Sequence, residues 1–423
     1  MTSPISSERL MQRIVEFAAI GRDPGGGITR PFGSDADFEA RTAFHREVIE
    51  AGLEYQVDAA GNQWGRMPGH EASAKTIAAG SHLDTVPHGG AYDGAAGVLM
   101  SLEVLQSLAA RGYRNRHPLA VVAFTGEEPN PFGLSTLGSR LYTGRLGSAQ
   151  LMTHTSDNGR LLTEALRRVG GDLANCDSLD PDEIGAFIEP HIEQSGRLDA
   201  ADLPIGVVDR ITGIYRDHIT LTGEQNHAGT TVLAHRRDAL HAFSHAVLAL
   251  NALLREPWPH WMVGTVGQVH VYPNAVNIVP SQVVFTVEIR STDVDQLQHA
   301  AERYRQRLEQ AMTSLSIAVT IRNILNQAPQ PLSADLQRIL VNAAQSRGVA
   351  PPILNSWAGH DATHMARRVP TGMLFIRSLA GKSHCPDEAS RAPDLAMGAE
   401  ILHDALIALD QTLEEVVTGV KAL

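Results

Sequence analysis

The stretch GSHLDTVPHGGAYDGAAGV, residues 80–98, decides how this chain folds and where its chemistry lies. It joins an apolar run at 76–79 to a segment with helical spacing, and it places His82, Asp84 and Asp93 among five glycines. Such a strand-to-helix turn leaves little side-chain bulk where an ion or a substrate would approach. His82 and Asp84 are two residues apart near a predicted strand end, so they point to the same side. This spacing suits a metal ligand and the carboxylate that orients it.

The composition of the chain excludes several classes of protein. Its 423 residues, 43% of them hydrophobic, can bury a large core, and this length favours two domains over one. The formal net charge is −12 and there is no basic block, so neither nucleic acid nor an anionic membrane surface is expected as a partner. There is no apolar run of a membrane span's length, no signal-peptide pattern, and only Cys176 and Cys385 are available for a disulfide. These features predict a soluble, reduced, cytoplasmic protein.

Short apolar runs alternate with helical patterns in the first half of the chain and again near its end. Strands are predicted within 117–128, 185–194 and 371–378, and the first of these is a β-branched run typical of a strand buried on both faces of a parallel sheet. This alternation predicts an α/β layered domain. The predicted apolar face of the helix after residue 94 consists of Val98, Leu102, Leu105 and Ala109.

Residues 213–327 have a different order of elements. They read as β-α-β-β-α-β, the split arrangement of a ferredoxin-like α+β domain. We therefore expect this domain to be inserted into the α/β catalytic domain, which would comprise residues 1–212 and 328–423, with hinges near 210 and 327. The predicted strands are 214–223, 263–270, 282–290 and 316–324, and the helices are 235–254, with Leu240, Phe243, Val247, Leu250 and Leu254 as its apolar face, and 294–313.

Three further segments, VVAFTGEEPN, FIEPHIEQ and LAGKSHCPDE, place acidic or imidazole side chains just past predicted strands. They supply Glu127 and Glu128, His191, and His384; of the adjacent glutamates, one would bind metal and the other act as general base. Ligands bind at the carboxyl ends of strands in open α/β sheets. Imidazole and carboxylate without thiolate are the ligands of hydrolytic zinc or manganese sites. A carboxylate such as Asp93 can bridge two ions about 3.5–4 Å apart, so the sequence predicts a di-metal site at these strand ends.

These segments resemble a known family. GSHLDTVPHGGAYDGAAGV, FTGEE, IEPHIEQ, HAGTT, RRDAL, NAVNIVP, EIRS, AGHDA and GKSHCPDE follow one another as in the metal-dependent peptidase family M20. They look most like its hydantoinase/carbamoylase branch, which includes N-carbamoyl-L-amino-acid amidohydrolases, allantoate amidohydrolases and β-ureidopropionases. Peptidases of the wider family usually carry Asp-Asp where this chain has Asp93-Gly94, and glutamate where it has His191. The resemblance covers nearly the whole chain, from GGGITRPFGSDADF onward.

The resemblance implies two divalent metal ions per subunit, with zinc expected first and manganese, cobalt or nickel as alternatives. One ion would be held by His82, Asp93 and His191, and the other by Asp93, Glu128 and His384.

It also implies the remaining catalytic roles. Glu127 would be the general base, with Asp84 behind His82. The inserted domain would be a lid and dimerisation domain, and His227 would reach from the partner subunit of a homodimer to polarise the scissile carbonyl. Arg290, with its planar fork, and Asn277 would hold the substrate carboxylate. The implied substrate-binding residues are Gln194, His227, Asn277, Arg290, Gly359 and His360.

The function implied is hydrolysis of N-carbamoyl-L-amino acids to amino acid, carbon dioxide and ammonia. Allantoate or another ureido acid, or an N-acyl amino acid, would be cleaved by the same chemistry, and a non-catalytic metal-binding homologue is the rival from another class. The chain departs from the branch pattern at three places that bear on substrate choice. These are Pro129-Asn130-Pro131-Phe132 in place of Gly-Ser-Arg-Phe, Ser195-Gly196 in place of Gly-Pro, and Trp357 in place of glycine.

Overall fold

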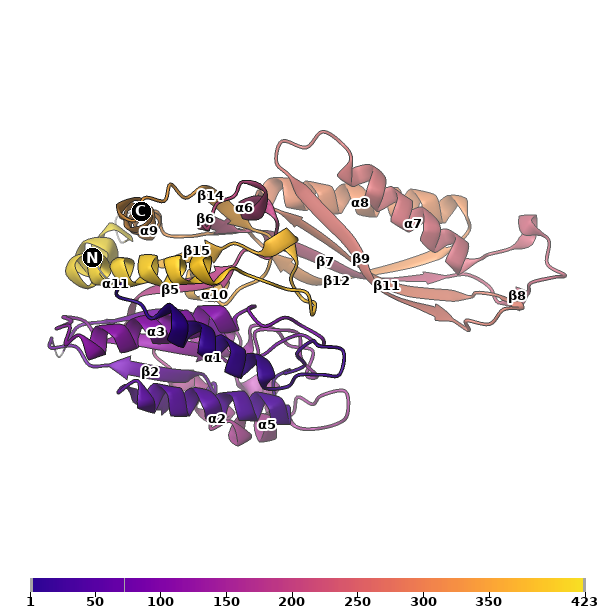
Figure 1. The fold of residues 1–423 in the computed structure, drawn as a ribbon. Coiled ribbons are helices and arrows are strands. Elements are labelled where there is room, and N and C mark those ends of the chain that lie inside the picture. The colour runs from indigo at the N-terminus through magenta and orange to yellow at the C-terminus, as the bar shows by residue number, and fades with distance from the viewer. Residues whose placement is uncertain (1–2, 72, 421–423) are drawn as a thin grey trace. The chain divides into compact units, whose positions relative to one another are not determined.

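The computed structural model describes residues 3–71 and 73–420 and divides the chain into two compact units. One unit ends at Asp209 and resumes at Pro331, and the other runs from Arg210 to Gln330. In Figure 1 the first unit holds the indigo and yellow segments, and the second holds a segment of intermediate colour. No helix within the described residues is both long enough and apolar enough to cross a membrane.

The first unit is built on a nine-stranded mixed sheet. Its path is β1 (Glu54–Val57), β2 (Gln63–Met67), β4 (Leu119–Phe124), β3 (Thr76–His82), β5 (Ile184–Ile192), β15 (Thr371–Ile376), β6 (Ile205–Ile211) and β13 (Gln330–Pro331), with β14 (Ile353–Ser356) paired to β6. The four central strands β4, β3, β5 and β15 are parallel, whereas β1, β2 and β6 are antiparallel to their neighbours. Every residue of the four parallel strands is buried, which confirms the predicted α/β class.

Helix α3 (Ala95–Ala110) follows the opening stretch and packs against β3 and β5. The predicted one-sided apolar face was too narrow, because nearly the whole helix is buried as far as Leu108. Helices α1 (Ser7–Ala19) and α11 (Ala392–Val420) pack on its other sides, so it lies inside the unit rather than on its surface. The other helices are α2 (Asp35–Glu50), α4 (Leu137–Tyr142), α5 (Leu162–Arg168), α6 (Arg197–Ala200), α9 (Ala334–Ser346) and α10 (Ala362–Met365), with 3₁₀ turns η1 (Ala149–Leu151), η2 (Leu173–Ser178), η3 (Pro181–Glu183) and η5 (Leu379–Gly381).

The second unit has the predicted ferredoxin-like β-α-β-β-α-β order. Its antiparallel sheet runs β12 (Ala318–Gln327), β7 (Gly213–Thr222), β11 (Gln282–Ser291), β9 (Met262–Tyr272). Buried and half-buried residues alternate along β11, because one face of the sheet packs under α7 (Ala239–Leu254) and α8 (Val294–Ser314). A short pair, β8 (Asn226–His227) and β10 (Ile278–Val279), and the turn η4 (Leu233–His235) complete the unit.

The predicted apolar face of α7 was wrong by about one position around the helix. The structure buries a stripe rich in alanine, and Leu240 is 43% exposed. Alanine lets the helix approach the sheet closely, and hydrophobicity alone does not distinguish that stripe from the leucine-rich one beside it. Asp238 caps the helix by accepting bonds from the main-chain N–H groups of Leu240 and His241. The buried residues are Ala239, Ala242, Ala246, Leu250 and Leu253.

Glu103 joins α1 to α3 from a fully buried position, and its loss should destabilise the first unit. Its carboxylate accepts bonds from Arg9 at 2.7 Å and from the main-chain N–H of Ser6 at 2.9 Å, and it lies 3.2 Å from Arg13. We predict that Glu103→Ala lowers the free energy of unfolding by about 3 kcal/mol. This is the lower end of the range for breaking a buried ion pair, about 3–5 kcal/mol, because Arg13 keeps a second carboxylate partner in Glu47. Urea denaturation measures this.

The control for this prediction is Glu50→Ala, which removes an exposed carboxylate 3.9 Å from Arg46. It should change the free energy of unfolding by less than about 0.5 kcal/mol. An effect of Glu103→Ala as small as that of the control would contradict the structural role of Glu103.

Candidate metal centre

The predicted ligands gather at the carboxyl ends of the four parallel strands. Because those strands run in the same direction, their ends meet at one edge of the sheet, and residues some 300 positions apart in the chain become neighbours. They are His82 at the end of β3, Glu127 and Glu128 after β4, His191 near the end of β5, and His384 beyond β15.

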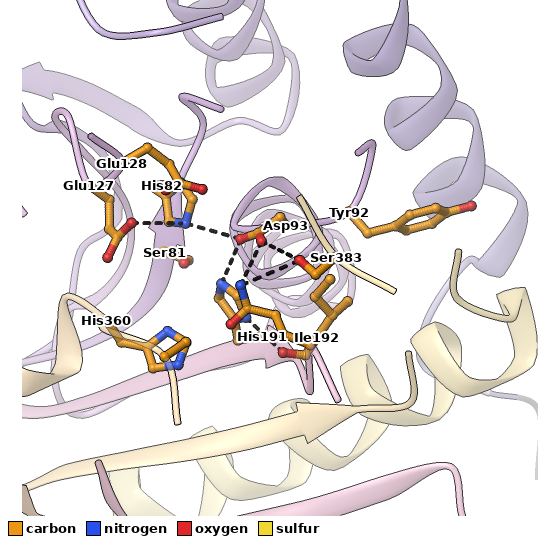
Figure 2. A network of polar contacts seen from close by, with 12 residues as sticks. Ser81, His82, Tyr92, Asp93, Glu127, Glu128, His191, Ile192, His360 and Ser383 are labelled. Atoms are coloured by element: carbon orange, nitrogen blue, oxygen red, sulfur yellow. Dashed lines mark hydrogen bonds and ion pairs between the residues drawn. The ribbon is translucent and has the colours of Figure 1, made fainter. Parts of the chain in front are cut away.

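Asp93 lies between these side chains, just before α3, and each of its carboxylate oxygens faces a different group (Figure 2). Its Oδ1 is 3.5 Å from Nε2 of His82 and 3.2 Å from Nε2 of His191. Its Oδ2 is 3.3 Å from Nε2 of His384, which in turn is 3.2 Å from Oε1 of Glu128. Two groups of three candidate ligands therefore share one carboxylate.

The imidazole rings are oriented so that Nε2 faces the cluster. Nδ1 of His82 lies 3.0 Å from the main-chain oxygen of Asp84, and Nδ1 of His191 lies 2.8 Å from that of Ile192. A carbonyl oxygen only accepts, so each Nδ1 carries hydrogen and donates it. Nε2 of His191 is buried and lies 3.2 Å from Oδ1 of Asp93. A nitrogen lone pair aimed at a carboxylate needs a proton or a metal cation between the two, and imidazole with carboxylate is a donor set that fits divalent metal ions.

Asp84 makes different contacts from those predicted. Its carboxylate is 3.8 Å from Nδ1 of His82, and the ring instead bonds to its main-chain oxygen. The carboxylate accepts the main-chain N–H groups of Glu127 at 3.2 Å and Glu128 at 3.0 Å. Because the ring takes the main-chain oxygen of Asp84, the carboxylate is left to accept other donors. Asp84 therefore holds both the imidazole and the glutamate pair.

Burial and opposite charge within the cluster shift the pKa values of its members. Burial lowers the pKa of His82, but the bond with Asp93 and the charge of Glu127 raise it well above its usual range. The bonds with Asp93 and Glu128 raise the pKa of His384 to about 10. Burial raises the pKa of Asp93, yet its bonds with the surrounding imidazoles hold that pKa well below its usual range. Burial raises the pKa of Glu127 well above its usual range. In the metal-free protein, protons on the imidazoles therefore balance the negative charge of the carboxylates, as bound metal cations would.

Gly94 allows Asp93 to approach His82. It is the N-cap of α3 and has φ of 63°, a backbone conformation that L side chains rarely adopt. A Cβ at this position would lie 2.3 Å from Cε1 of His82. Only glycine therefore fits between the ring and the start of the helix.

Glu189 is a buried carboxylate that sequence reasoning missed. It lies two residues before His191 on the same face of β5, and that alternation was the available signal. Its oxygens accept bonds from Oγ of Ser81 at 2.8 Å and from the main-chain N–H of Ala362 at 2.7 Å. It also forms a third group of candidate ligands with His191 and His360. Because strong donors already occupy both oxygens, Glu189 ties β3, β5 and α10 together beneath the centre.

The structure brings some predicted substrate-binding residues to the cluster in the first unit. Gln194 has φ of 58° and donates from Nε2 to Oδ2 of Asp93 at 2.7 Å, whereas its buried Oε1 has no hydrogen-bond partner within the described chain. The ring of His360 is buried with its centroid 4.6 Å from that of His191 (Figure 2). Gly359 is exposed in the loop before it.

Three other predicted residues belong to the second unit. His227 is exposed, and its Nδ1 accepts the main-chain N–H groups of Gly229 at 3.0 Å and Thr230 at 3.1 Å. Because Nδ1 accepts, the ring hydrogen is on Nε2, which makes His227 a hydrogen-bond donor at its tip. Arg290 donates from Nε to Glu288 at 2.7 Å, and Asn277 is exposed beside β10.

The chain belongs to peptidase family M20/M25/M40, whose pattern matches residues 78–408. It is an amidohydrolase of the hydantoinase/carbamoylase branch, a hydrolase of non-peptide C–N bonds. It is similar to the N-carbamoyl-L-amino acid amidohydrolase of Geobacillus stearothermophilus, with 35% identity over 96% of this chain and 99% of that protein. It is 33% identical to the allantoate amidohydrolase of Escherichia coli strain K12, over 91% and 94% of the two chains. It is also 33% identical to the ureidoglycolate hydrolase of Oryza sativa subsp. japonica, over 96% and 85%.

A solved structure shows the same architecture. The hydantoinase/carbamoylase-family amidase of Burkholderia vietnamiensis superposes with a TM-score of 0.87 at 32% identity, covering 96% of this chain and 97% of that one. Family membership and the buried clusters of histidine and carboxylate together indicate metal binding.

Metal binding should release protons. At about pH 8 the imidazole of His384, whose pKa is raised to about 10, keeps a proton that an ordinary histidine, with a pKa of about 6.5, would have lost. A divalent ion that takes the same nitrogen atom must displace this proton, so we predict that metal binding releases about one proton at that site. Titration calorimetry in two buffers of different ionisation enthalpy measures this number. Binding without proton release would show that the imidazole of His384 is neutral before the metal binds.

The raised pKa of His384 also sets the sign of its contribution to the pH dependence of stability in the metal-free protein. The pKa of His384 is raised on folding, so its contribution to stability is full below about pH 6.5 and is lost as the pH rises through about 10.

Proposed function

We propose that this enzyme hydrolyses the ureido C–N bond of N-carbamoyl-L-amino acids to give the L-amino acid, carbon dioxide and ammonia. The observation that carries the proposal is the placement of Asp93, whose two oxygens face two separate groups of ligands. Beside them stands Glu127, a carboxylate that belongs to neither group. The 35% identity to an N-carbamoyl-L-amino acid amidohydrolase over almost the full length supports this substrate class.

Two divalent cations would occupy the centre, with zinc favoured and manganese, cobalt or nickel as alternatives. His82, Asp93 and His191 would hold one, and Asp93, Glu128 and His384 the other. Cations bound there would lower the pKa of water towards neutrality and polarise the substrate carbonyl.

Glu127 would act as the general base. Its Oε2 is 3.8 Å from Nε2 of His82, and its main chain is held by Asp84. Burial raises the pKa of Glu127, and a raised pKa makes a carboxylate a stronger base towards water. The water oxygen would bond to the ureido carbon, the C–N bond to the terminal nitrogen would break, and Glu127 would pass its proton to that nitrogen, which leaves as ammonia. The N-carboxy amino acid that remains would lose carbon dioxide.

Residues of the second unit would bind substrate. Nε2–H of His227, oriented by two main-chain N–H groups, would donate to the developing oxyanion. We propose that it does so from the partner subunit of a homodimer, with the inserted unit as lid and dimerisation domain. Arg290 and Asn277 would hold the substrate carboxylate. Gln194, Gly359 and His360 would complete the pocket.

Allantoate or another ureido acid is the second candidate substrate. The identity to the allantoate amidohydrolase of E. coli, 33%, is almost as high as that to the carbamoylase. The same centre would also cleave an N-acyl amino acid. Ammonia release from N-carbamoyl-L-amino acids, their D-enantiomers, allantoate and β-ureidopropionate, with amine release from N-acyl amino acids, distinguishes these substrates. Turnover confined to allantoate would overturn the first choice and keep the mechanism.

Glu127→Gln tests the base. The variant should keep both metal ions, because Glu127 lies outside both ligand groups, and should lose about 10²–10⁴-fold in kcat. Glu128→Gln is the matched control: the neighbouring carboxylate is a proposed ligand, so this variant should lose metal as well as turnover. Metal analysis and kcat together separate the two outcomes. A Glu127→Gln enzyme with near-normal kcat would show that another group takes the proton.

Mixing two inactive variants tests the shared site. In a heterodimer of His227→Ala and Glu127→Gln, a site acting across the interface would combine one intact centre with one intact His227. Random exchange of subunits should therefore restore about a quarter of wild-type activity. Each variant alone should stay inactive. No recovery after exchange, verified with differently tagged subunits, would place His227 in the same subunit as its centre.

A further inference from the structure

Glu388 contacts the segment that carries Asp93 but belongs to neither group of candidate ligands. It lies in the irregular segment between β15 and α11 that also carries His384, and it is only 6% exposed. Its Oε1 accepts two consecutive main-chain N–H groups, that of Tyr92 at 2.8 Å and that of Asp93 at 3.0 Å. One carboxylate oxygen therefore fixes the backbone from which the shared carboxylate projects.

Ser383 extends this contact to the side chain of Asp93. Its Oγ is 2.8 Å from Oδ2 of Asp93 and 3.0 Å from Oε2 of Glu388 (Figure 2 shows the contact with Asp93). A hydroxyl has a single hydrogen, so it donates to one of these carboxylates at a time and sits between them. Both oxygens of Glu388 are thus engaged, one by the segment that carries Asp93 and the other by the segment that carries His384.

The backbone of the neighbouring turn is shaped to admit Glu388. A Cβ on Gly90 would lie 2.1 Å from Oε1 of Glu388 and 2.4 Å from its Cβ. Any side chain at position 90 would push the glutamate away from the amides of Tyr92 and Asp93. Gly90, in the turn before Asp93, therefore leaves room for Glu388, just as Gly94 leaves room for His82.

We infer that Glu388 is a positioning residue, which fixes Asp93 and His384 relative to each other and so sets the affinity for the ion that they share. This inference rests on the proposed two-ion centre. It assigns Glu388 no contact with substrate or with the reacting atoms. Residues that support metal ligands in this way typically change metal affinity by about 10–100-fold when they are removed.

The chain offers a matched control in Asp410. This carboxylate is 2% exposed and accepts two consecutive main-chain N–H groups, those of Arg116 at 3.1 Å and His117 at 2.8 Å. Those residues precede β4, at the opposite end of that strand from Glu127 and Glu128. Asp410→Ala therefore removes the same kind of contact without touching the proposed ligands.

The test is titration of metal-free wild type, Glu388→Ala, Glu388→Gln and Asp410→Ala with Mn²⁺ or Zn²⁺ against a competing chelator. Glu388→Ala should weaken one ion by about 10–100-fold and leave the other nearly unchanged. Glu388→Gln keeps an acceptor for both amides and offers a donor to Ser383, so it should stay within about threefold of wild type. Asp410→Ala should lose stability and keep both affinities. At saturating metal, kcat of Glu388→Ala should recover, because only the metal requirement shifts.

Two results would overturn the inference: wild-type affinities in Glu388→Ala, or an equal loss of affinity in Asp410→Ala. If Glu388→Ala does not fold, Ser383→Ala replaces it. That variant removes the hydroxyl between the two carboxylates and should weaken the same ion about tenfold, and unchanged binding there would also overturn the inference. A wild type that binds fewer than two ions would instead refute the proposed function, so the two failures are distinguishable.

Discussion

A single carboxylate, that of Asp93, must face two groups of candidate ligands at once, and the strand ends and helix start of the first unit are arranged around that requirement. Asp93 can meet it because α3 begins immediately after it, with glycine at the N-cap, so that the acid comes within reach of three imidazole rings. The rings of His82 and His191 come from the ends of β3 and β5, and that of His384 from the segment after β15; parallel pairing of these strands brings their ends to one edge. These side chains form a candidate metal centre because of where the fold places them, and not only because of their chemical types.

The same requirement explains the density of buried charge. Taking carboxylates out of water costs several kcal/mol per ion unless opposite charge and hydrogen bonds offset it. Three carboxylates of the first unit that support the candidate ligands have their own donors: Asp84 has the amides of the glutamate pair, Glu189 has Ser81 and Ala362, and Glu388 has two amides of the turn. Main-chain amides thus hold the acids that support the centre. The lone pairs of the imidazoles are left for cations.

Much of this was predictable from sequence. Apolar β-branched runs followed by acid or imidazole predicted the parallel strands and the edge at which the candidate ligands meet, and the order of elements in 213–327 predicted the ferredoxin-like unit. The sequence could not predict which oxygen of Asp84 accepts the hydrogen bond from His82. Its side-chain and main-chain oxygens are both acceptors, and both belong to the same position in the sequence. The alternation along β5 places Glu189 on the same face as His191, but the contact of Glu189 with Ala362, like that of Glu388 with Tyr92, joins residues far apart in the chain, and no local pattern predicts it. The prediction of the buried face of α7 was wrong for another reason: the small side chains, rather than the most hydrophobic ones, pack against the sheet.

Anomalous diffraction from crystals of the manganese- or zinc-loaded enzyme tests the central claim most directly. The shared carboxylate requires two peaks, one on each side of Asp93, the first beside His82 and His191 and the second beside Glu128 and His384. A single peak, or peaks away from Asp93, would contradict the bridging role on which the account depends.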